Sequence, residues 1–427
     1  MGRLAYFDLE IAKLIKQEGE RQRFTLSLVA SENYASRATL EAQGSIVSNK
    51  LSQGYIGNRV CGGCHYVDQI EELAIKRAKK LFGAEHVNVQ AATASIANLA
   101  VYHAMLNLGD TVLAMKREHG GHNTHGSPVN LSGKIYRFIF YELDPITERL
   151  NYETIRELAL SHKPRMIIAG YTNYARTIDF SIFRKIADEV GAYLMVDMAH
   201  IVGLIIAGIH PNPIPYADVI TTSTHKTFRG PRGGGIILCR KDYSEQIDKA
   251  LSPGLQAAPM MDVIAARTVL LKEAMSPQFR AYQHQIVRNA KTLAEALMLQ
   301  GFKLLSGGTD THVMLINLRD KGITGDVAES VLERVGIIVN KSKVPFDKVE
   351  SPQPGGIRVG TPAVTTRGMK EQEMEHVAEL MGSILKNPED QEIMDKVRRE
   401  VRRLTKKFPL FSKEWEPQPD CDSNFKE

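Results

Sequence analysis

The chain has 427 residues, 43% of them hydrophobic, and a formal net charge of +5. That length allows two or three domains around a large core, and so small a charge does not indicate a nucleic-acid partner. Four cysteines are too few for a disulfide framework, and no run of about 18 apolar residues predicts a membrane span. Because residues 1–20 resemble neither a secretory signal nor a transit peptide, we expect a cytoplasmic location.

Residues 58–66 read NRVCGGCHY and place Cys61, Cys64 and His65 in the C-x-x-C-H spacing that attaches c-type haem. Five residues match such a string easily by chance, and this haem is normally attached outside the cytoplasm. Three ligands so close together rarely complete a tetrahedral metal site on their own. We therefore expect neither haem nor a bound metal.

Short apolar runs alternate with amphipathic segments through residues 86–276. Segment 179–191 has the pattern of a helix, and buried strands are predicted at 111–115, 165–170, 192–197, 218–223 and 234–239. Strands that alternate with helices predict an α/β domain with a mostly parallel sheet.

The pattern changes at about Pro277. A long helical stretch, 279–300, is followed by a predicted strand at 312–319, a helix and a further strand at 335–340, which indicates a smaller α+β domain over residues 277–410. The basic stretch 396–407 has apolar residues at helical spacing and is predicted to be a solvated helix. The polar tail, 411–427, is predicted to be disordered.

Polar side chains follow the ends of two predicted strands. Asp197 ends one strand and has His200 three residues on, and Ser223, His225 and Lys226 follow the other. Ligands of open α/β sheets bind at the carboxyl ends of the strands. A desolvated lysine can bind a carbonyl cofactor, and an aspartate can hold a protonated pyridine, which fits pyridoxal phosphate (PLP). A structural salt bridge uses the same pair of residues, so spacing alone leaves both interpretations open.

Longer motifs are more specific. They are VASEN (29–33), HGGH (119–122), THGSPVN (124–130), VDMAHIVG (196–203), THKTFRGPRGG (224–234), LLSGGTDTH (304–312) and GIRVGTPAVTTRG (356–368). In this order they resemble the serine hydroxymethyltransferase family of fold-type-I PLP enzymes, from about Leu28 to Leu410. The resemblance implies a large PLP-binding domain, a small C-terminal domain, and a homodimer with shared active sites that residues 1–85 help to form. It also implies small-molecule substrates: an amino acid, with an aldehyde or a folate.

The resemblance also assigns roles to individual residues. Lys226 would bind PLP covalently, Asp197 would hold its ring nitrogen, and His122 would stack on the ring. Arg358, assisted by Ser31, would bind the substrate carboxylate. The other cofactor-binding positions would be Thr93, Ala94 and Ser95 at a helix start that receives the phosphate, with Thr172, His200, Ser223 and His225. His225 has simple packing as its alternative.

One loop departs from the family pattern at positions that handle the substrate. Gln53 stands where the family has a glutamate that exchanges a proton with the substrate hydroxyl, and an amide cannot carry that proton. Val60 and Cys61 replace two adjacent tyrosines near the substrate and folate, and Leu51 replaces a third. Further substitutions are Ala257 and Ala258 for a glycine pair at the phosphate, and Arg117, Glu118, Asn123 and Ser342 around the usual folate pocket.

These substitutions spare Lys226, Asp197 and Arg358. We therefore predict a PLP enzyme that makes or breaks the Cα–Cβ bond of serine, glycine or a related β-hydroxy amino acid, with doubtful dependence on tetrahydrofolate. The alternatives are an ordinary tetrahydrofolate-dependent enzyme, or another PLP reaction such as transaldol transfer, transamination or racemisation. Arg117 suggests an anionic acceptor, unless it only forms a surface ion pair with Glu118.

Overall fold

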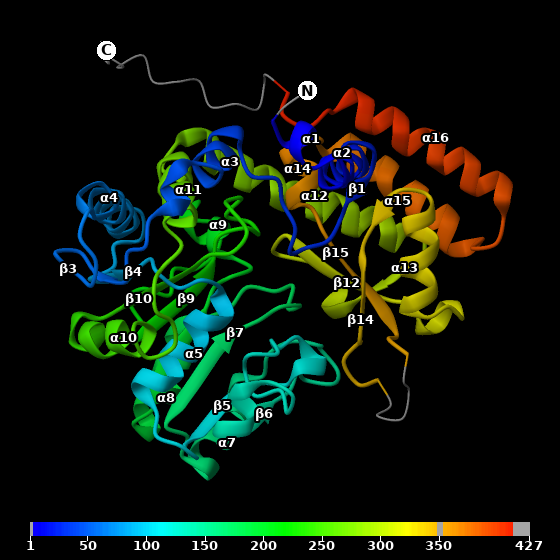
Figure 1. Ribbon diagram of the computed structural model, residues 1–427. Coiled ribbons are helices and arrows are strands. Elements are labelled where there is room, and N and C mark those ends of the chain that lie inside the picture. The colour runs from blue at the N-terminus through cyan, green and yellow to red at the C-terminus, as the bar shows by residue number, and fades with distance from the viewer. Residues whose placement is uncertain (1–2, 348–352, 413–427) are drawn as a thin grey trace.

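The computed structural model describes residues 3–347 and 353–412. Two β-sheets organise this part of the chain, and each has its own covering of helices (Figure 1). The larger sheet lies at the lower left of Figure 1 and the smaller one to its right. Most of the tail that was predicted to be disordered, residues 413–427, lies outside the described residues.

The larger sheet has seven strands and carries the predicted α/β fold. Its strands are, in spatial order, β4 (His86–Asn88), β10 (Gly235–Cys239), β9 (Val219–Ser223), β8 (Tyr193–Asp197), β7 (Met166–Gly170), β5 (Thr111–Met115) and β6 (Arg137–Tyr141). The pairs from β9 to β6 are parallel, and β10 is antiparallel to both of its neighbours. The α/β class with a mostly parallel sheet is thus confirmed, and β4 and β6 are strands that the sequence patterns missed.

Alternate residues of these strands enter two separate cores. In β5, for example, Val112 and Ala114 pack on one face of the sheet, while Leu113 and Met115 pack on the other. Both faces are buried, which explains why the strands read as continuous apolar runs. One face is covered by α5 (Ala94–Met105), α6 (Leu131–Ile135) and α10 (Ser244–Leu251). The other is covered by α4 (His65–Phe82), α7 (Tyr152–His162), α8 (Phe180–Val190), α9 (Val202–Ile206) and α11 (Met261–Ala274).

The smaller sheet is antiparallel. Its order is β11 (Lys303–Leu304), β12 (Val313–Asn317), β15 (Gly356–Gly360) and β14 (Asn340–Ser342). Its helices are α13 (Gly325–Arg334), α14 (Pro362–Thr366), α15 (Glu371–Lys386) and α16 (Gln391–Lys407). The basic stretch 396–407 lies in α16, where Val397, Val401 and Leu404 are buried.

The prediction of one continuous strand at 335–340 is wrong in one respect. Ile337 and Ile338 form β13, which pairs with β1 (Leu26–Ser27), and β14 begins separately at Asn340. Leu26 and Leu28 are therefore part of the same core as the smaller sheet. The N-terminal segment contributes to a core some 300 residues away along the chain, a contact that no local pattern reveals.

One helix, α12 (Pro277–Leu299), joins the two halves. Its first part, including Tyr282 and Ile286, packs in the core of the larger sheet, and its last part, including Leu293 and Leu297, packs in the core of the smaller one. Pro277, where we expected the pattern to change, is the first residue of this helix. The domain boundaries at 85/86, 276/277 and 410/411 stay a prediction.

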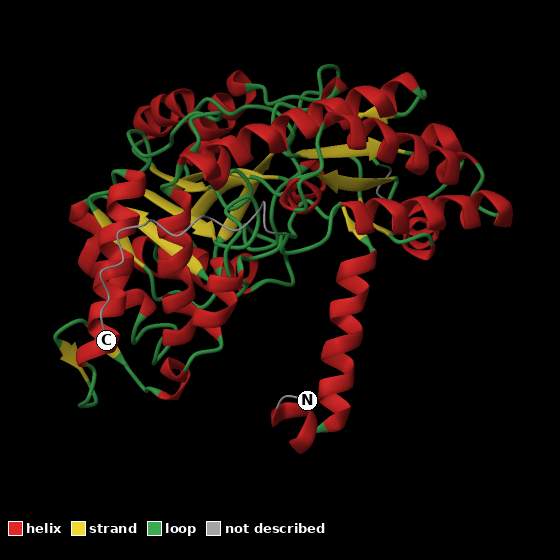
Figure 2. Ribbon diagram, turned by 90° about the horizontal axis from the view of Figure 1, so that it is seen from above, coloured by secondary structure: helices red, strands yellow, loops and turns green. Residues whose placement is uncertain are grey.

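The chain begins with α1 (Arg3–Phe7) and α2 (Leu9–Phe24), which project from the body of the molecule (Figure 2). Neither helix has a buried residue, although several of their apolar side chains are exposed. Within the described part of the chain, every helix is too short or too polar to cross a bilayer.

The loop that carries the substitutions contains a small hairpin, β2 (Gly54–Tyr55) and β3 (Asn58–Arg59). The guanidinium of Arg59 holds it against α4, with Nη2 2.5 Å from Glu71 Oε2 and Nε 2.8 Å from Asp68 Oδ1. The Arg59 and Glu71 side chains are only 3% and 1% exposed. The pair is therefore buried, and removing one partner would leave an uncompensated charge.

We predict that Arg59→Ala lowers the free energy of unfolding by about 3 kcal/mol, because Glu71 then loses its buried counter-charge. Urea unfolding measures the change. The control is Arg156→Ala, which removes exposed pairs with Glu153 and Glu189 and is expected to cost less than about 1 kcal/mol. Equal destabilisation of the two variants would contradict the prediction.

Candidate active site

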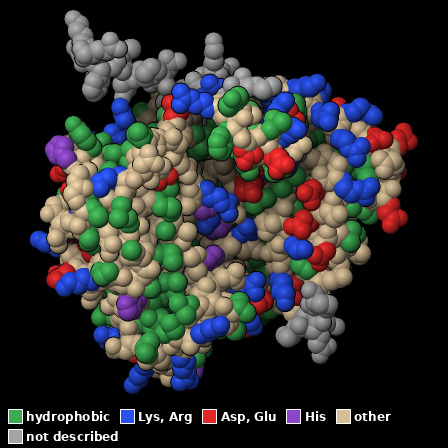
Figure 3. All heavy atoms as spheres, viewed as in Figure 1, with side chains coloured by type: hydrophobic (Ala, Val, Ile, Leu, Met, Phe, Trp, Pro, Cys, Tyr) green, Lys and Arg blue, Asp and Glu red, His purple; other side chains and the backbone are tan. Residues whose placement is uncertain are grey.

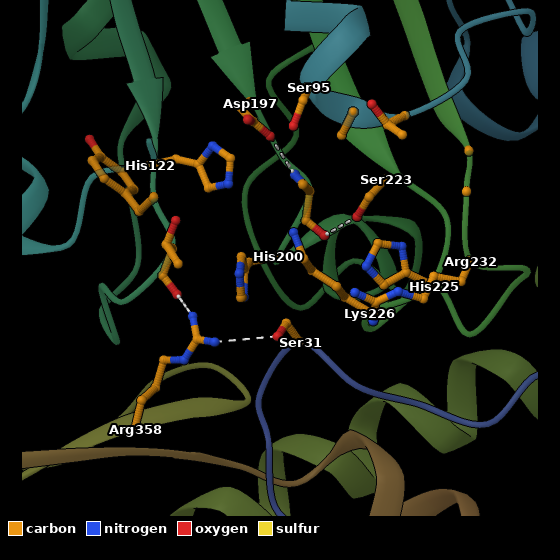
Figure 4. Close-up of a pocket in the computed structure, with 17 residues that line it drawn as sticks. Ser31, Ser95, His122, Asp197, His200, Ser223, His225, Lys226, Arg232 and Arg358 are labelled. Atoms are coloured by element: carbon orange, nitrogen blue, oxygen red, sulfur yellow. Dashed lines mark hydrogen bonds between the residues drawn. The ribbon is translucent and has the colours of Figure 1, made fainter. Parts of the chain in front are cut away.

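A cavity of about 600 Å³ lies between the two halves of the molecule. Figure 3 shows the hollow at this place, with histidine and basic side chains gathered in it. Its wall contains Ser31, Thr93, Ala94, Ser95, His122, Tyr171, Thr172, Asp197, Ala199, His200, Ser223, His225, Lys226, Arg232, Gly233, Gly234 and Arg358. All predicted cofactor-binding residues, and both predicted carboxylate-binding residues, thus face one cavity (Figure 4).

Asp197 ends β8 and is 8% exposed. Asn98 Nδ2 donates to its Oδ2 at 3.0 Å, His125 Nε2 lies 3.2 Å from the same oxygen, and the Ala199 N–H donates to Oδ1 at 3.0 Å. Burial opposes ionisation, but the His125 hydrogen bond and the positive charges nearby outweigh it and hold the pKa of Asp197 well below its ordinary value. Asp197 is therefore a buried carboxylate that stays ionised.

Lys226 follows β9, the neighbour of β8, so its amine enters the cavity from the adjacent strand end. Burial lowers the pKa of Lys226 to about 8, although the charge of Asp197 partly opposes the shift. Two backbone features constrain the loop around Lys226. The Gly230 N–H donates to Thr224 O, and Arg229 adopts a left-handed φ of 67°. Such a conformation in a non-glycine residue is costly and is concentrated at functional sites.

The three histidines in the wall of the cavity, His122, His200 and His225, are neutral at neutral pH. Burial lowers the pKa of His122 to about 4 and that of His225 to about 3, and it lowers the pKa of His200 well below its usual range. The His200 ring stacks on that of His312, with centroids 5.5 Å apart. The positive charge in this wall therefore comes from Lys226 and two arginines, Arg232 and Arg358, which lie at opposite ends of the cavity in Figure 4.

The helix start predicted to receive a phosphate is present. Thr93 is the N-cap of α5, and its hydroxyl accepts from the Ile96 N–H at 3.1 Å, which leaves the Ala94 and Ser95 N–H groups without helical partners. Gly235 packs against this turn, and a Cβ at Gly235 would lie 2.5 Å from Thr93 O. The close approach explains why a glycine stands at the first position of β10.

Arg358 comes from β15 of the smaller sheet. Its Nη1 donates to Thr172 O at 3.1 Å, its Nη2 to Ser31 Oγ at 3.3 Å and its Nε to Asn340 Oδ1 at 3.1 Å. These contacts hold the guanidinium at the cavity wall, where a carboxylate could meet it in a two-pronged contact. Ser31 and Arg358, 327 residues apart, are thus neighbours, as predicted.

Gln53 and Cys61, two other predicted site residues, are not in this wall. They belong to the hairpin loop at the far left of Figure 1, beside β3 and α4. Cys64 Sγ contacts Cys61 O at 3.2 Å, and His65 begins α4. In residues 3–347 and 353–412, no three His, Cys, Asp or Glu side chains are grouped to hold a metal ion.

Several site residues were missed in the sequence. Arg232, Gly233 and Gly234 line the cavity, although no role was assigned to them from the sequence. Asn98 and His125 hold Asp197, and Tyr102 OH lies 2.5 Å from His125 Nδ1. A basic residue among glycines after a predicted strand was a signal that could have identified Arg232. No sequence pattern pointed to Asn98.

The cavity fits PLP on its own chemistry. Thr172 Oγ1 and His225 Nδ1 are buried without a hydrogen-bond partner among the described residues, at the wall where a ligand would supply one. The helix start and Arg232 suit a phosphate, Asp197 suits a protonated ring nitrogen, and Lys226 suits a carbonyl carbon. The sequence profile of the serine hydroxymethyltransferase family matches residues 4–381 of this chain.

We predict that the stability of the protein without cofactor depends on pH through Lys226. Between the folded pKa of about 8 and the unfolded value of 10.5, the unfolded state binds more protons, so stability rises with pH over that window. Relative to Lys226→Met, the wild type should gain about 3 kcal/mol from pH 8 to 10.5. Thermal unfolding of both proteins measures this, and parallel curves would contradict it.

Proposed function

This chain belongs to the serine hydroxymethyltransferase family of PLP-dependent transferases that interconvert serine and glycine, and we propose that it makes or breaks the Cα–Cβ bond of a β-hydroxy amino acid with little dependence on tetrahydrofolate. One observation carries the proposal. Asp197 is the sole carboxylate in the described wall of the cavity, and it is committed to Asn98 and His125. No acidic group of this wall is left to exchange a proton with the substrate hydroxyl, and the hairpin loop that a second copy would bring to the cavity carries the amide of Gln53 in place of the expected carboxylate.

When bound, PLP withdraws electrons from the α-carbon of the amino acid that it holds. Lys226 supplies the amine that anchors it, and a pKa of about 8 leaves part of that amine unprotonated, and hence nucleophilic, near neutral pH. Asp197 stays ionised and would hold a protonated ring nitrogen, which would strengthen that withdrawal. His122 is neutral and flat, as stacking on the ring requires.

Arg358 and Ser31 orient the substrate. A carboxylate held by the guanidinium would be fixed in orientation, and this would decide which bond of the substrate α-carbon is presented for cleavage. The choice of bond decides between cleavage of Cα–Cβ and removal of the α-proton. His122 and His200 are neutral imidazoles in the same wall, and in this proposal one of them takes up the hydroxyl proton.

A homodimer with shared active sites is part of the proposal. Large apolar side chains are exposed in two segments: Leu4, Tyr6, Phe7, Leu9, Leu14 and Ile15 in α1 and α2, and Ile46, Leu51, Ile56, Val60 and Tyr66 around the hairpin loop. Such surface favours association. A second copy would cover it and bring the hairpin loop, with Gln53 and Cys61, to the cavity of its partner.

The first test follows the α-carbon. We predict that the purified enzyme exchanges the α-proton of glycine in deuterium oxide and cleaves serine to glycine at a rate that tetrahydrofolate changes less than twofold. Lys226→Ala is the control and should lose both activities. Robust folate-dependent turnover would identify an ordinary hydroxymethyltransferase, and exchange without any aldehyde product would favour racemisation or transamination.

The second test concerns the hairpin loop. We predict that Gln53→Glu raises serine cleavage at least tenfold, because a carboxylate restores proton transfer, which is worth about 10²–10⁴-fold. Gln69→Glu adds the same charge to an exposed position of the neighbouring helix α4 and should change nothing. No gain from Gln53→Glu would show that the amide is not the cause of altered chemistry.

A further inference from the structure

A second cavity of about 450 Å³ adjoins the first, and we call it the annex. Its described wall contains Arg117, Glu118, Gly121, His122, Asn123, Thr172, Asn173, Asn340, Lys341, Ser342, Lys343, Pro354 and Arg358. His122, Thr172 and Arg358 face both cavities, so a molecule in the annex would touch the wall of the PLP cavity.

The annex has an unusual lining for a ligand site. Among its described residues, Pro354 is the sole apolar side chain, whereas sites for organic ligands are mostly apolar with a few polar groups. Asn173 Nδ2 donates to Ser342 Oγ at 2.9 Å across it. The side chains of the annex therefore offer mainly hydrogen bonds and charge, which suit a small and strongly polar molecule.

Its charge is positive. The described wall of the annex carries four cationic side chains and one carboxylate. The cations are Arg117, Lys341, Lys343 and Arg358, and the carboxylate is that of Glu118. Lys341 is engaged with Asp326 Oδ1 at 2.7 Å and Glu329 Oε2 at 3.6 Å, and Arg358 is held as described above.

Two cations of the annex have no counter-charge among the residues that the structure describes. Arg117 and Lys343 are exposed, and neither forms an ion pair within residues 3–347 and 353–412. The surface ion pair between Arg117 and Glu118, weighed from the sequence, is not formed in this part of the chain. Arg117 follows β5 of the larger sheet, and Lys343 follows β14 of the smaller one, so the two charges reach the annex from different halves of the molecule.

We propose that the annex binds the anionic end of a small carbonyl compound, an aldehyde that bears a carboxylate or a phosphate, as the partner of glycine in the proposed reaction. Its carbonyl then lies at the shared wall beside the PLP cavity. The inference rests on the proposed function. The step balances without another reactant: the new bond joins the glycine α-carbon to the carbonyl carbon, the α-proton leaves, and the carbonyl oxygen takes up one proton.

The test compares aldehydes that differ mainly in charge. Labelled glycine is incubated with 4-oxobutanoate or butanal, and with glyceraldehyde 3-phosphate or glyceraldehyde, and the β-hydroxy amino acid is measured by mass spectrometry. We predict a kcat/KM at least tenfold higher for the anion in one of the two pairs, and that pair identifies the carboxylate or the phosphate. The preference should fall as salt is added.

Variants then assign the preference to the annex. The double variant Arg117→Ala, Lys343→Ala should raise KM for the anionic aldehyde about tenfold, with kcat and the neutral aldehyde unaffected, because exposed charges contribute modestly each. Glu118→Gln removes the opposing carboxylate and should lower that KM. The control is Lys134→Ala, Arg280→Ala, which removes the same charge from exposed positions outside the annex.

The proposal is overturned if the wild type treats charged and neutral aldehydes alike, or if the control and the annex variant lose the same activity. It is also overturned if tetrahydrofolate binds saturably and the annex variant weakens that binding. Exchange of the glycine α-proton in deuterium oxide separates failure of the inference about the annex from failure of the proposed function. Exchange without a charge preference removes the inference about the annex alone, and absence of exchange removes the proposed function.

Discussion

An ionised carboxylate inside the protein is the constraint on which the site depends. Asp197 is buried, and a buried charge is unfavourable unless other groups compensate it. Asn98 from α5, His125 from the loop before α6 and the Ala199 N–H supply that compensation. Three parts of the larger half must therefore meet before the carboxylate can stay charged opposite the amine of Lys226.

The cavity is completed from outside the larger sheet. Arg358 reaches it from the smaller half and donates to Thr172 O, while Asn33 of the N-terminal segment donates to the backbone oxygen of Lys226 at 2.8 Å. Helix α12 contributes to both cores and so links the two halves that contact the substrate. A shift between the halves would move the carboxylate clamp relative to the lysine.

The departures from the family pattern that the resemblance implies lie around the residues predicted to bind the cofactor. The strand ends carry residues that are predicted to bind PLP, whereas the hairpin loop and the walls of the annex carry the residues that depart from the expected family pattern. Loops on a rigid scaffold are where new specificity arises most readily, because they can change without disturbing the core. The proposed binding of a second substrate in the annex fits that pattern.

The sequence alone was enough for the α/β class, the five buried strands and the placement of Asp197 and Lys226, because burial on both faces and position at strand ends leave local signals. The roles expected for Gln53 and Cys61 came from resemblance and still await a test. The tertiary structure decided the rest: the pairing of β1 with β13, the help of Asn98 and His125 at Asp197, the place of Arg232, and the polar annex. These depend on contacts between residues far apart in the chain, which no local pattern encodes.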